Sequence, residues 1–285
     1  MQRLITDRGE RTDIHIHNAG GWVNAFRVRV AYAEQFRIGP VFLAGEAAHV
    51  QTGGGLCSAI YDSSNLSWKL ATALCGGPSW LLDTYEEERG CSARHEIETT
   101  WELMYRATGL DSDGGGRAEP NPHQMLTALN DPQMHRQMSG LAIRYRESPL
   151  SLTWGDATGK DVVAGDRAPD APCRDLLADT MVRLFDLYRG PHWTLLGFGP
   201  QGAETIRAYH APGFINMKPH AVLKPTDPAA ENAVIDVEGH AHRSFQIDDS
   251  AIVLIRLDNY IGLIAWPADA AALDAYFDHL RDPHF

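Results

Sequence analysis

The sequence is poor in basic residues, in cysteine and in long apolar runs. It contains 25 Lys and Arg against 37 Asp and Glu, a formal net charge of −12. Such a charge repels phosphate backbones and anionic lipid surfaces, so nucleic acids and membranes are not expected as partners. No apolar stretch approaches the roughly 20 residues of a membrane-spanning helix, and the polar start of the chain lacks the apolar core of a signal peptide. The four cysteines form no Cys-x-x-Cys pair, which favours reduced thiols, and we expect a soluble, cytoplasmic protein.

The first part of the chain also lacks the glycine fingerprint of a dinucleotide-binding domain. Such a domain holds the pyrophosphate with Gly-x-Gly-x-x-Gly between a strand and a helix. No stretch before Gly45 matches this pattern, and the glycine run at 53–55 is common in plain loops. His15 and His17 would share one strand face, a spacing that some metal sites use, but no third ligand is identifiable. We therefore predict no metal site.

The length of 285 residues allows one large domain or two of ordinary size. Residues 146–170 are rich in turn-forming residues and poor in periodic apolar residues, which indicates a boundary. The segments that follow read as strands, a helix, more strands and a closing helix, the order of a compact α/β unit. We predict an α/β protein with domains at 1–160 and 161–285.

Alternation of apolar and polar residues predicts a hairpin of half-buried strands over 13–32. The apolar run at 40–45 ends in glycine and predicts a buried strand that enters a tight turn. Further strands are predicted at 181–187, 193–198 and 251–256.

A helix is predicted over 62–75, after the glycine loop. Asp62 is a capping residue near its start, and Leu66, Leu70 and Leu74 would share its buried face. Further helices are predicted at 80–107, 122–146 and 268–281.

Three segments carry a resemblance to a known family. Residues 37–49 read Arg-Ile-Gly-Pro-Val-Phe-Leu-Ala-Gly-Glu-Ala-Ala-His, residues 62–70 end in Asn-Leu-Ser-Trp-Lys-Leu, and residues 82–89 read Leu-Asp-Thr-Tyr-Glu-Glu-Glu-Arg. With 140–145 and 165–169, they resemble the flavoprotein aromatic hydroxylases of the p-hydroxybenzoate hydroxylase fold, in the branch that tailors aromatic polyketides. The resemblance implies that 1–160 is a truncated hydroxylase core without its N-terminal dinucleotide-binding half. It also implies that 161–285 is a thioredoxin-like domain without redox cysteines.

The cofactor of that family is FAD, and the resemblance assigns its contacts to a glycine turn, the loop after it and the start of the next helix. Glu46 stands where the family has Asp, and the loop after His49 is a few residues shorter and lacks the paired prolines. Because the fingerprint is also missing, no cofactor is expected for the isolated chain, and FAD is expected only if the chain works as a monooxygenase. The candidate flavin contacts are Gly45, Glu46, Gly53, Gly54 and Gly55.

Candidate catalytic residues lie around the same turn and in the helix after it, and candidate substrate-binding residues lie in the predicted hairpin at 13–32. Acid–base side chains there could serve catalysis if they line a cavity, and aromatic side chains could stack on an aromatic substrate. The alternatives are structural: His49 could fix the loop through a backbone carbonyl, Cys57 could be a buried thiol rather than a nucleophile, and the aromatic residues could be core. The candidate catalytic residues are Glu46, His49, Tyr61 and Asp62, and the candidate substrate residues are Trp22, Phe26 and Arg27.

Two functions follow from the resemblance. The first is a cofactor-independent tailoring enzyme, a cyclase or rearrangement catalyst, that acts on a polycyclic aromatic molecule of the polyketide type. The second is a non-catalytic or complementing subunit of an FAD- and NAD(P)H-dependent monooxygenase, with a split monooxygenase as a third possibility. A core without its covering half would expose apolar surface, so we expect a homodimer or a complex with a flavoprotein.

Overall fold

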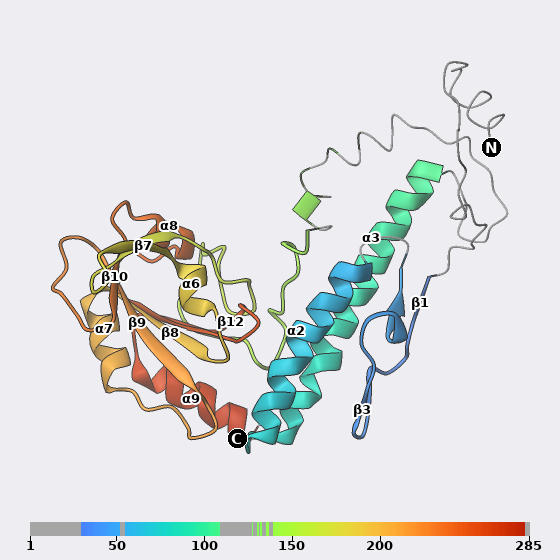
Figure 1. Cartoon of the computed structure of the whole chain (residues 1–285), viewed down its shortest axis with the longest axis horizontal. Helices are drawn as coiled ribbons and strands as arrows, with labels where there is room; N and C mark the ends of the chain where they lie inside the picture. The colour runs from blue at the N-terminus through green and yellow to red at the C-terminus, as the bar shows by residue number, and fades with distance from the viewer. Residues whose placement is uncertain are drawn as a thin grey trace.

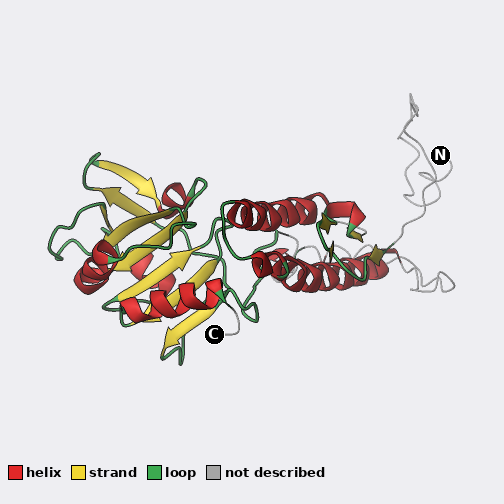
Figure 2. Cartoon of the chain, turned by 90° about the horizontal axis from the view of Figure 1, so that it is seen from below, coloured by secondary structure: helices red, strands yellow, loops and turns green. Residues whose placement is uncertain are grey.

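The computed structural model describes residues 30–51, 55–108, 127, 130, 132, 135–136 and 139–282, of which 102–108 are described by their backbone alone. Two bodies lie side by side (Figure 1): a pair of long helices with short strands, and a mixed sheet covered by helices. The view turned by 90° shows the same division (Figure 2). This architecture confirms the predicted α/β class. Among these residues, no helix combines the length and the apolar character needed to cross a membrane.

The strands beside the helix pair are only two residues long. β1 (Ala31–Tyr32) pairs with β4 (His49–Val50), and β2 (Arg37–Ile38) pairs with β3 (Val41–Phe42), both antiparallel. Of the strand predicted at 40–45, only Val41–Phe42 is a strand, and the tight turn predicted after it is present at Gly45, where φ is 60°. Its predicted burial is wrong, because Val41 is 60% exposed in the β2–β3 hairpin. A 3-10 turn, η1 (Gly45–Ala47), follows. Most of the hairpin predicted at 13–32 lies outside the described residues.

Helix α2 (Gly55–Leu74) begins seven residues before the predicted start at Asp62. The Asp62 side chain does not cap the helix, because tertiary partners use both of its carboxylate oxygens. The predicted apolar face is also wrong, since Leu74 is 86% exposed. Polar residues instead dominate the buried face, which consists of Ser58, Asp62, Asn65, Trp68, Lys69 and Thr72.

The helix predicted over 80–107 is broken into three pieces. These are a 3-10 turn η2 (Ser79–Leu82), a π-helical turn η3 (Glu86–Gly90) and α3 (Cys91–Thr108). A π turn widens the helix locally and often marks a functional site; here it lies where the neighbours Glu88 and Arg89 are both buried. Of the helix predicted at 122–146, the few described residues up to 136 include helical ones, and 139–146 form turns and irregular chain.

The second body is one eight-stranded sheet in the order β5-β12-β11-β8-β9-β10-β6-β7. The predicted strands at 193–198 and 251–256 and the final helix are confirmed, whereas 181–187 is a strand only in its first half and then turns into α6. Because β5 pairs with β12, the sheet includes residues before the expected boundary at 160. The strands are β5 (Leu152–Gly155), β6 (Pro172–Asp175), β7 (Thr180–Arg183), β8 (Trp193–Phe198), β9 (Met217–Leu223), β10 (Ala233–Ile235), β11 (Ala251–Ile255) and β12 (Ile261–Trp266). The helices are α6 (Leu184–Tyr188), α7 (Gly199–Ala208), α8 (His240–Phe245) and α9 (Ala270–Arg281).

Both faces of the central strands are buried. Leu195 belongs to the cluster that includes residues of α7 and α9, and its neighbour Leu196 belongs to the cluster that includes residues of α6 and α8. Two covered faces explain why β8 and β11 are continuous apolar runs rather than alternating ones. The first cluster also contains Trp68 of α2 and Leu81 of η2, so it joins the sheet to the helix pair.

A Gly-x-Gly-x-x-Gly sequence occurs at 197–202, between β8 and α7. The structure explains its glycines by packing: a Cβ on Gly197 would lie 2.4 Å from the carbonyl oxygen of Gly202, and a Cβ on Gly202 would lie 2.8 Å from that of Ala251. Gly199 has a left-handed φ of 68°, and its Cβ would lie 2.4 Å from the carbonyl oxygen of Asp249. Close backbone contacts account for all three glycines without a nucleotide.

Candidate functional site

Asp62 ties the glycine turn to both long helices. One carboxylate oxygen accepts from Nε of Arg89 at 2.7 Å, and the other accepts from the Gly45 N–H at 2.9 Å and lies 2.7 Å from Nε2 of His49. Burial alone would raise the pKa of Asp62, but the hydrogen bond with His49 and the charge of Arg89 lower it below its ordinary value. Asp62 is therefore a buried carboxylate that holds the turn, α2 and η3 together.

The other turn residues have separate environments. Gly45 has a φ of 60°, and a Cβ there would lie 3.1 Å from Cβ of Ala59, so the turn needs glycine. His49 is 2% exposed, and its ring stacks on that of Phe36. Its hydrogen-bond partner is the Asp62 carboxylate, not the backbone carbonyl considered from the sequence. Glu46 lies in η1 with an exposed side chain.

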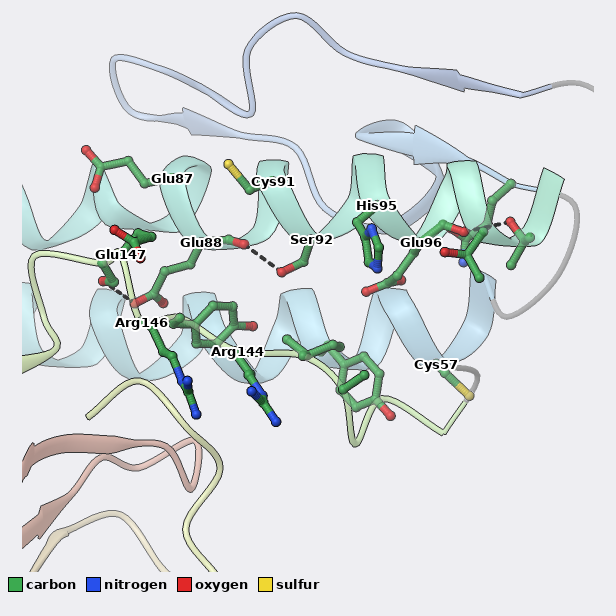
Figure 3. A pocket seen from close by; sticks show the side chains of 18 residues that line it. Cys57, Glu87, Glu88, Cys91, Ser92, His95, Glu96, Arg144, Arg146 and Glu147 are labelled. Carbon is green, nitrogen blue, oxygen red and sulfur yellow. Dashed lines mark hydrogen bonds between the residues drawn. The ribbon is translucent and has the colours of Figure 1, made fainter. Parts of the chain in front are cut away.

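A cavity of about 640 Å³ lies between α2, α3 and the segment 142–148. Figure 3 shows His95 and Glu96 projecting from α3 into the space between the helices, with Cys57 near the start of α2. Tyr61 also lines the cavity, and its hydroxyl donates to the Ser139 carbonyl at 2.9 Å. Burial raises the pKa of Tyr61, and a charge on Cys57 would raise it further. The acid–base side chains of Tyr61, His95 and Glu96 therefore line this cavity.

The structure does not bring the four candidate catalytic residues to one cavity. Tyr61 lines the cavity between the helices, while Glu46, His49 and Asp62 do not. Cys57 is exposed and lines the cavity, so it is not the buried thiol considered from the sequence. The remaining candidates, Trp22, Phe26, Arg27, Gly53 and Gly54, lie outside the described residues, and Gly55 is the first residue of α2.

A second buried ionic cluster joins the helix pair to the sheet. Arg256, directly after β11, donates to both oxygens of Glu88 at 2.6 and 2.8 Å and pairs with Asp258 at 2.6 Å. Nζ of Lys69 lies 2.8 Å from Glu88, and the Trp68 indole N–H donates to Asp258 at 2.9 Å. Each of these side chains is buried, so the cluster is shielded from water.

Burial would raise the pKa of Glu88, but the charges of Arg256 and Lys69 hold it far below its ordinary value. Burial lowers the pKa of Lys69 to about 8, although Glu88 partly opposes that shift. Two cations and two carboxylates balance one another in this cluster. Sequence reasoning missed it as a site, although Trp68, Lys69 and Glu88 all belong to the segments that carry the family resemblance.

Comparison with known proteins agrees with that resemblance. Residues 10–100 match the family described as an FAD binding domain. The chain is 33% identical over 267 residues to a flavin-dependent monooxygenase of Mycobacteroides abscessus, which covers 93% of this chain and 45% of that protein. It is 30% identical over 252 residues to pentachlorophenol 4-monooxygenase of Sphingobium chlorophenolicum, which covers 84% of this chain and 45% of that protein. Its fold matches CabE, an aromatic hydroxylase from angucycline biosynthesis, with a TM-score of 0.61 and 26% identity over 90% of this chain and 48% of that one.

The chain is similar in sequence to flavin-dependent monooxygenases, and its fold is similar to that of an aromatic hydroxylase. It spans less than half the length of each of these three proteins.

Some of the residues that the resemblance assigns to the flavin are described by the structure. The left-handed glycine turn at Gly45, the exposed carboxylate of Glu46 and the N-terminus of α2 provide backbone and a positive helix end where the family holds the flavin. The adenosine diphosphate end of FAD is normally held by a Gly-x-Gly-x-x-Gly turn. In this chain that sequence occurs at 197–202, where neighbouring backbone carbonyls pack closely against the glycines. Within the described residues, this Gly-x-Gly-x-x-Gly therefore does not leave room for a phosphate. The contacts of Gly45 and Glu46 with a flavin stay a prediction.

Proposed function

We propose that this chain forms part of an FAD-dependent aromatic hydroxylase. Its turn at Gly45 would contact the flavin, and its surface would dock on the polypeptide outside these residues that binds the dinucleotide. The observation that carries the proposal is the tie made by Asp62 to Gly45, His49 and Arg89. It fixes the turn and the start of α2 in a set geometry, which positioning of a flavin for hydroxylation requires.

Exposed apolar side chains support a docking role. Leu56 and Ile60 of α2 are 77% and 56% exposed, and Ile38 and Val41 of the β2–β3 hairpin are 66% and 60% exposed. Soluble proteins seldom leave several large apolar side chains uncovered unless a partner covers them. The dinucleotide-binding part of a hydroxylase is the partner we propose, and a homodimer is the alternative.

A bound flavin would supply the oxygen chemistry of ring hydroxylation. The residues of this chain would orient it: Glu46 would accept a hydrogen bond from the ribityl chain, and the backbone at the start of α2 would face the ring. The sheet body, with its β8–α7–β9 crossover, its β11–β12 hairpin and α9, would be the thioredoxin-like domain. Its one cysteine, Cys173, is buried, in keeping with a domain that performs no redox chemistry. We propose a polycyclic aromatic substrate, the class suggested by the similarity to CabE.

A second candidate is the cofactor-independent tailoring enzyme. The cavity beside Tyr61 favours it, because His95 and Glu96 supply acid–base groups next to a volume large enough for a fused-ring molecule. In this role the chain would catalyse a cyclisation or rearrangement without flavin.

A chimera tests the first proposal. This chain would replace the matched 45% of the Mycobacteroides abscessus monooxygenase. We expect the purified chimera to carry FAD at near-equimolar occupancy, and an Asp62→Asn version to lose most of it. A folded chimera without FAD, or an Asp62→Asn version with unchanged FAD content, would count against the proposal. Conversion of a polycyclic aromatic by the flavin-free chain, abolished in Tyr61→Phe, would favour the second candidate.

A further inference from the structure

A second cavity, of about 530 Å³, opens on the sheet body and shares no lining residue with the cavity beside Tyr61. It lies between the segment 158–160, the residue after β9 and helix α8. Its lining carries three cations, Lys160, Lys224 and Arg243, together with His242. A concave basic site is unusual on a chain with a net charge of −12.

Backbone carbonyls, which carry no net charge, hold all three cations. Nζ of Lys224 donates to the Asp248 carbonyl at 2.6 Å, and Nζ of Lys160 donates to the Gln246 carbonyl at 2.5 Å. Nη1 of Arg243 donates to the Glu238 carbonyl at 2.7 Å. These bonds fix the positions of the cations and leave their positive charge in place.

The residues that line the cavity include three cations and one carboxylate, that of Asp248. The Asp227 carboxylate accepts from the Lys224 backbone N–H at 2.8 Å. The Asp248 carboxylate lies 3.9 Å from Nζ of Lys160, but it is 96% exposed, so water screens it. The Glu238 carboxylate bonds to His240 rather than to Arg243. Asp161 accepts from the Gln246 amide. The cavity therefore keeps a surplus of positive charge and of N–H donors.

His242 adds a buried group whose hydrogen bonding is incomplete. Its Nδ1 lies 2.8 Å from the Asp236 carboxylate, its side chain is 7% exposed, and its Nε2 has no hydrogen-bond partner among the described residues. A buried polar atom without a partner costs free energy, so such atoms in folded proteins usually meet a water or a ligand.

We propose that this cavity binds the phosphate group of a small molecule. A phosphate group presents several charged oxygen acceptors, and lysine and arginine are the side chains that proteins most often use to bind them. The volume exceeds that of a single phosphate group and lies within the range of small-molecule sites, so the ligand is a phosphate ester or a diphosphate. The site is independent of the flavin turn and of the proposed hydroxylase role.

Isothermal titration calorimetry of the full chain with inorganic pyrophosphate tests the proposal. We expect saturable binding to one site, weakened about tenfold or more in Lys224→Gln and in Arg243→Gln, since each removes one charge-assisted bond. Lys218→Gln is the matched control, because Lys218 is exposed in β9 and lies outside the cavity. It should bind as the unchanged chain does. Unchanged thermal unfolding of all three variants would show that they fold.

Three results would overturn the proposal. They are no saturable heat with pyrophosphate, an affinity of Lys224→Gln and Arg243→Gln equal to that of the unchanged chain, or a weakening in Lys218→Gln as large as in those two variants. Parallel titrations with inorganic phosphate and ADP identify the source of the group. Tighter binding of ADP than of pyrophosphate supports a nucleotide ligand, and equal binding supports recognition of the phosphates alone.

Discussion

Arg256 and Glu88 face each other across 168 residues of sequence, with two guanidinium nitrogens on two carboxylate oxygens at 2.6 and 2.8 Å. Both side chains are buried, and the pair joins the turn after β11 to the π turn before α3. The sheet and the helix pair therefore share one interior at this point.

Removal of Arg256 should lower the free energy of unfolding more than removal of an exposed arginine does. Arg256→Met leaves Glu88 and Asp258 buried with fewer partners, which should lower the free energy of unfolding by about 3–5 kcal/mol. Arg174→Met removes an exposed pair with Asp179 and should cost less than about 1 kcal/mol. Urea unfolding of the two variants measures both values, and equal costs would show that the buried pair does not join the two bodies.

Lys69 should make stability rise with pH. Its pKa of about 8 in the folded chain lies below its ordinary value of 10.5. Between these values the unfolded chain binds more protons at Lys69 than the folded chain, so this residue contributes stability that increases as pH rises. The increase should be visible between pH 8 and about 9.5, before the tyrosines of the unfolded chain ionise near pH 10. The slope of unfolding free energy against pH should be more positive in the unchanged chain than in Lys69→Met, and identical slopes would refute the assignment.

The contacts of the Asp62 carboxylate with Gly45, His49 and Arg89 should lose their stabilising effect in acid. Because its folded pKa is lowered, its contribution is present above the ordinary carboxyl pKa and disappears as pH falls through the folded value. Asp62→Asn should therefore be less stable than the unchanged chain at pH 7, and the gap should narrow below about pH 4. Glu46→Gln, in the exposed turn, should stay within about 0.5 kcal/mol of the unchanged chain. If the difference in unfolding free energy between Asp62→Asn and the unchanged chain did not change with pH, the charge of Asp62 would not be the source of its stabilising effect.

The glycines at 197–202 should behave as packing residues. Gly197→Ala places a methyl group 2.4 Å from a carbonyl oxygen and should destabilise the chain by about 1–3 kcal/mol or more. Gly213→Ala is the control, because no atom lies within 4 Å of its added methyl group. Thermal unfolding distinguishes the two, and a tolerated Gly197→Ala would reopen the question of a phosphate turn at this position.

Cysteine labelling should report on the cavity between the helices. Cys57, Cys75 and Cys91 are exposed and should react with a maleimide in the folded chain, whereas Cys173 is buried and burial raises its pKa to about 12, so it should react only after unfolding. A molecule that fills the cavity should protect Cys57 and Cys91, which line it, and leave Cys75 reactive. Equal protection of all three would indicate a general effect on the fold.

The sequence allowed the sheet body to be predicted better than the helix pair. Long apolar runs such as 193–198 and 251–256 are strands because both faces are buried, and this shows in local composition. The start of α2 could not be predicted, because Asp62 looks like a helix cap when its partner Arg89 is unknown. The same limit applies to Glu88, whose partner Arg256 is brought close only by the packing of the two bodies.

For the site, the glycine turn and the family followed from the segments at 37–49, 62–70 and 82–89, and the comparisons agree with that family. Which residues share a cavity did not follow from sequence, since the space between α2 and α3 depends on the segment 142–148. The catalytic roles of Glu46, His49, Tyr61 and Asp62 stay predictions.

The most direct test of the central claim is the FAD content of the purified 285-residue chain after incubation with excess FAD and gel filtration. Because the sequence before Gly45 lacks the dinucleotide fingerprint, we predict a colourless protein peak, with FAD eluting separately as free cofactor. A yellow protein peak that carries nearly one FAD per chain would contradict the account.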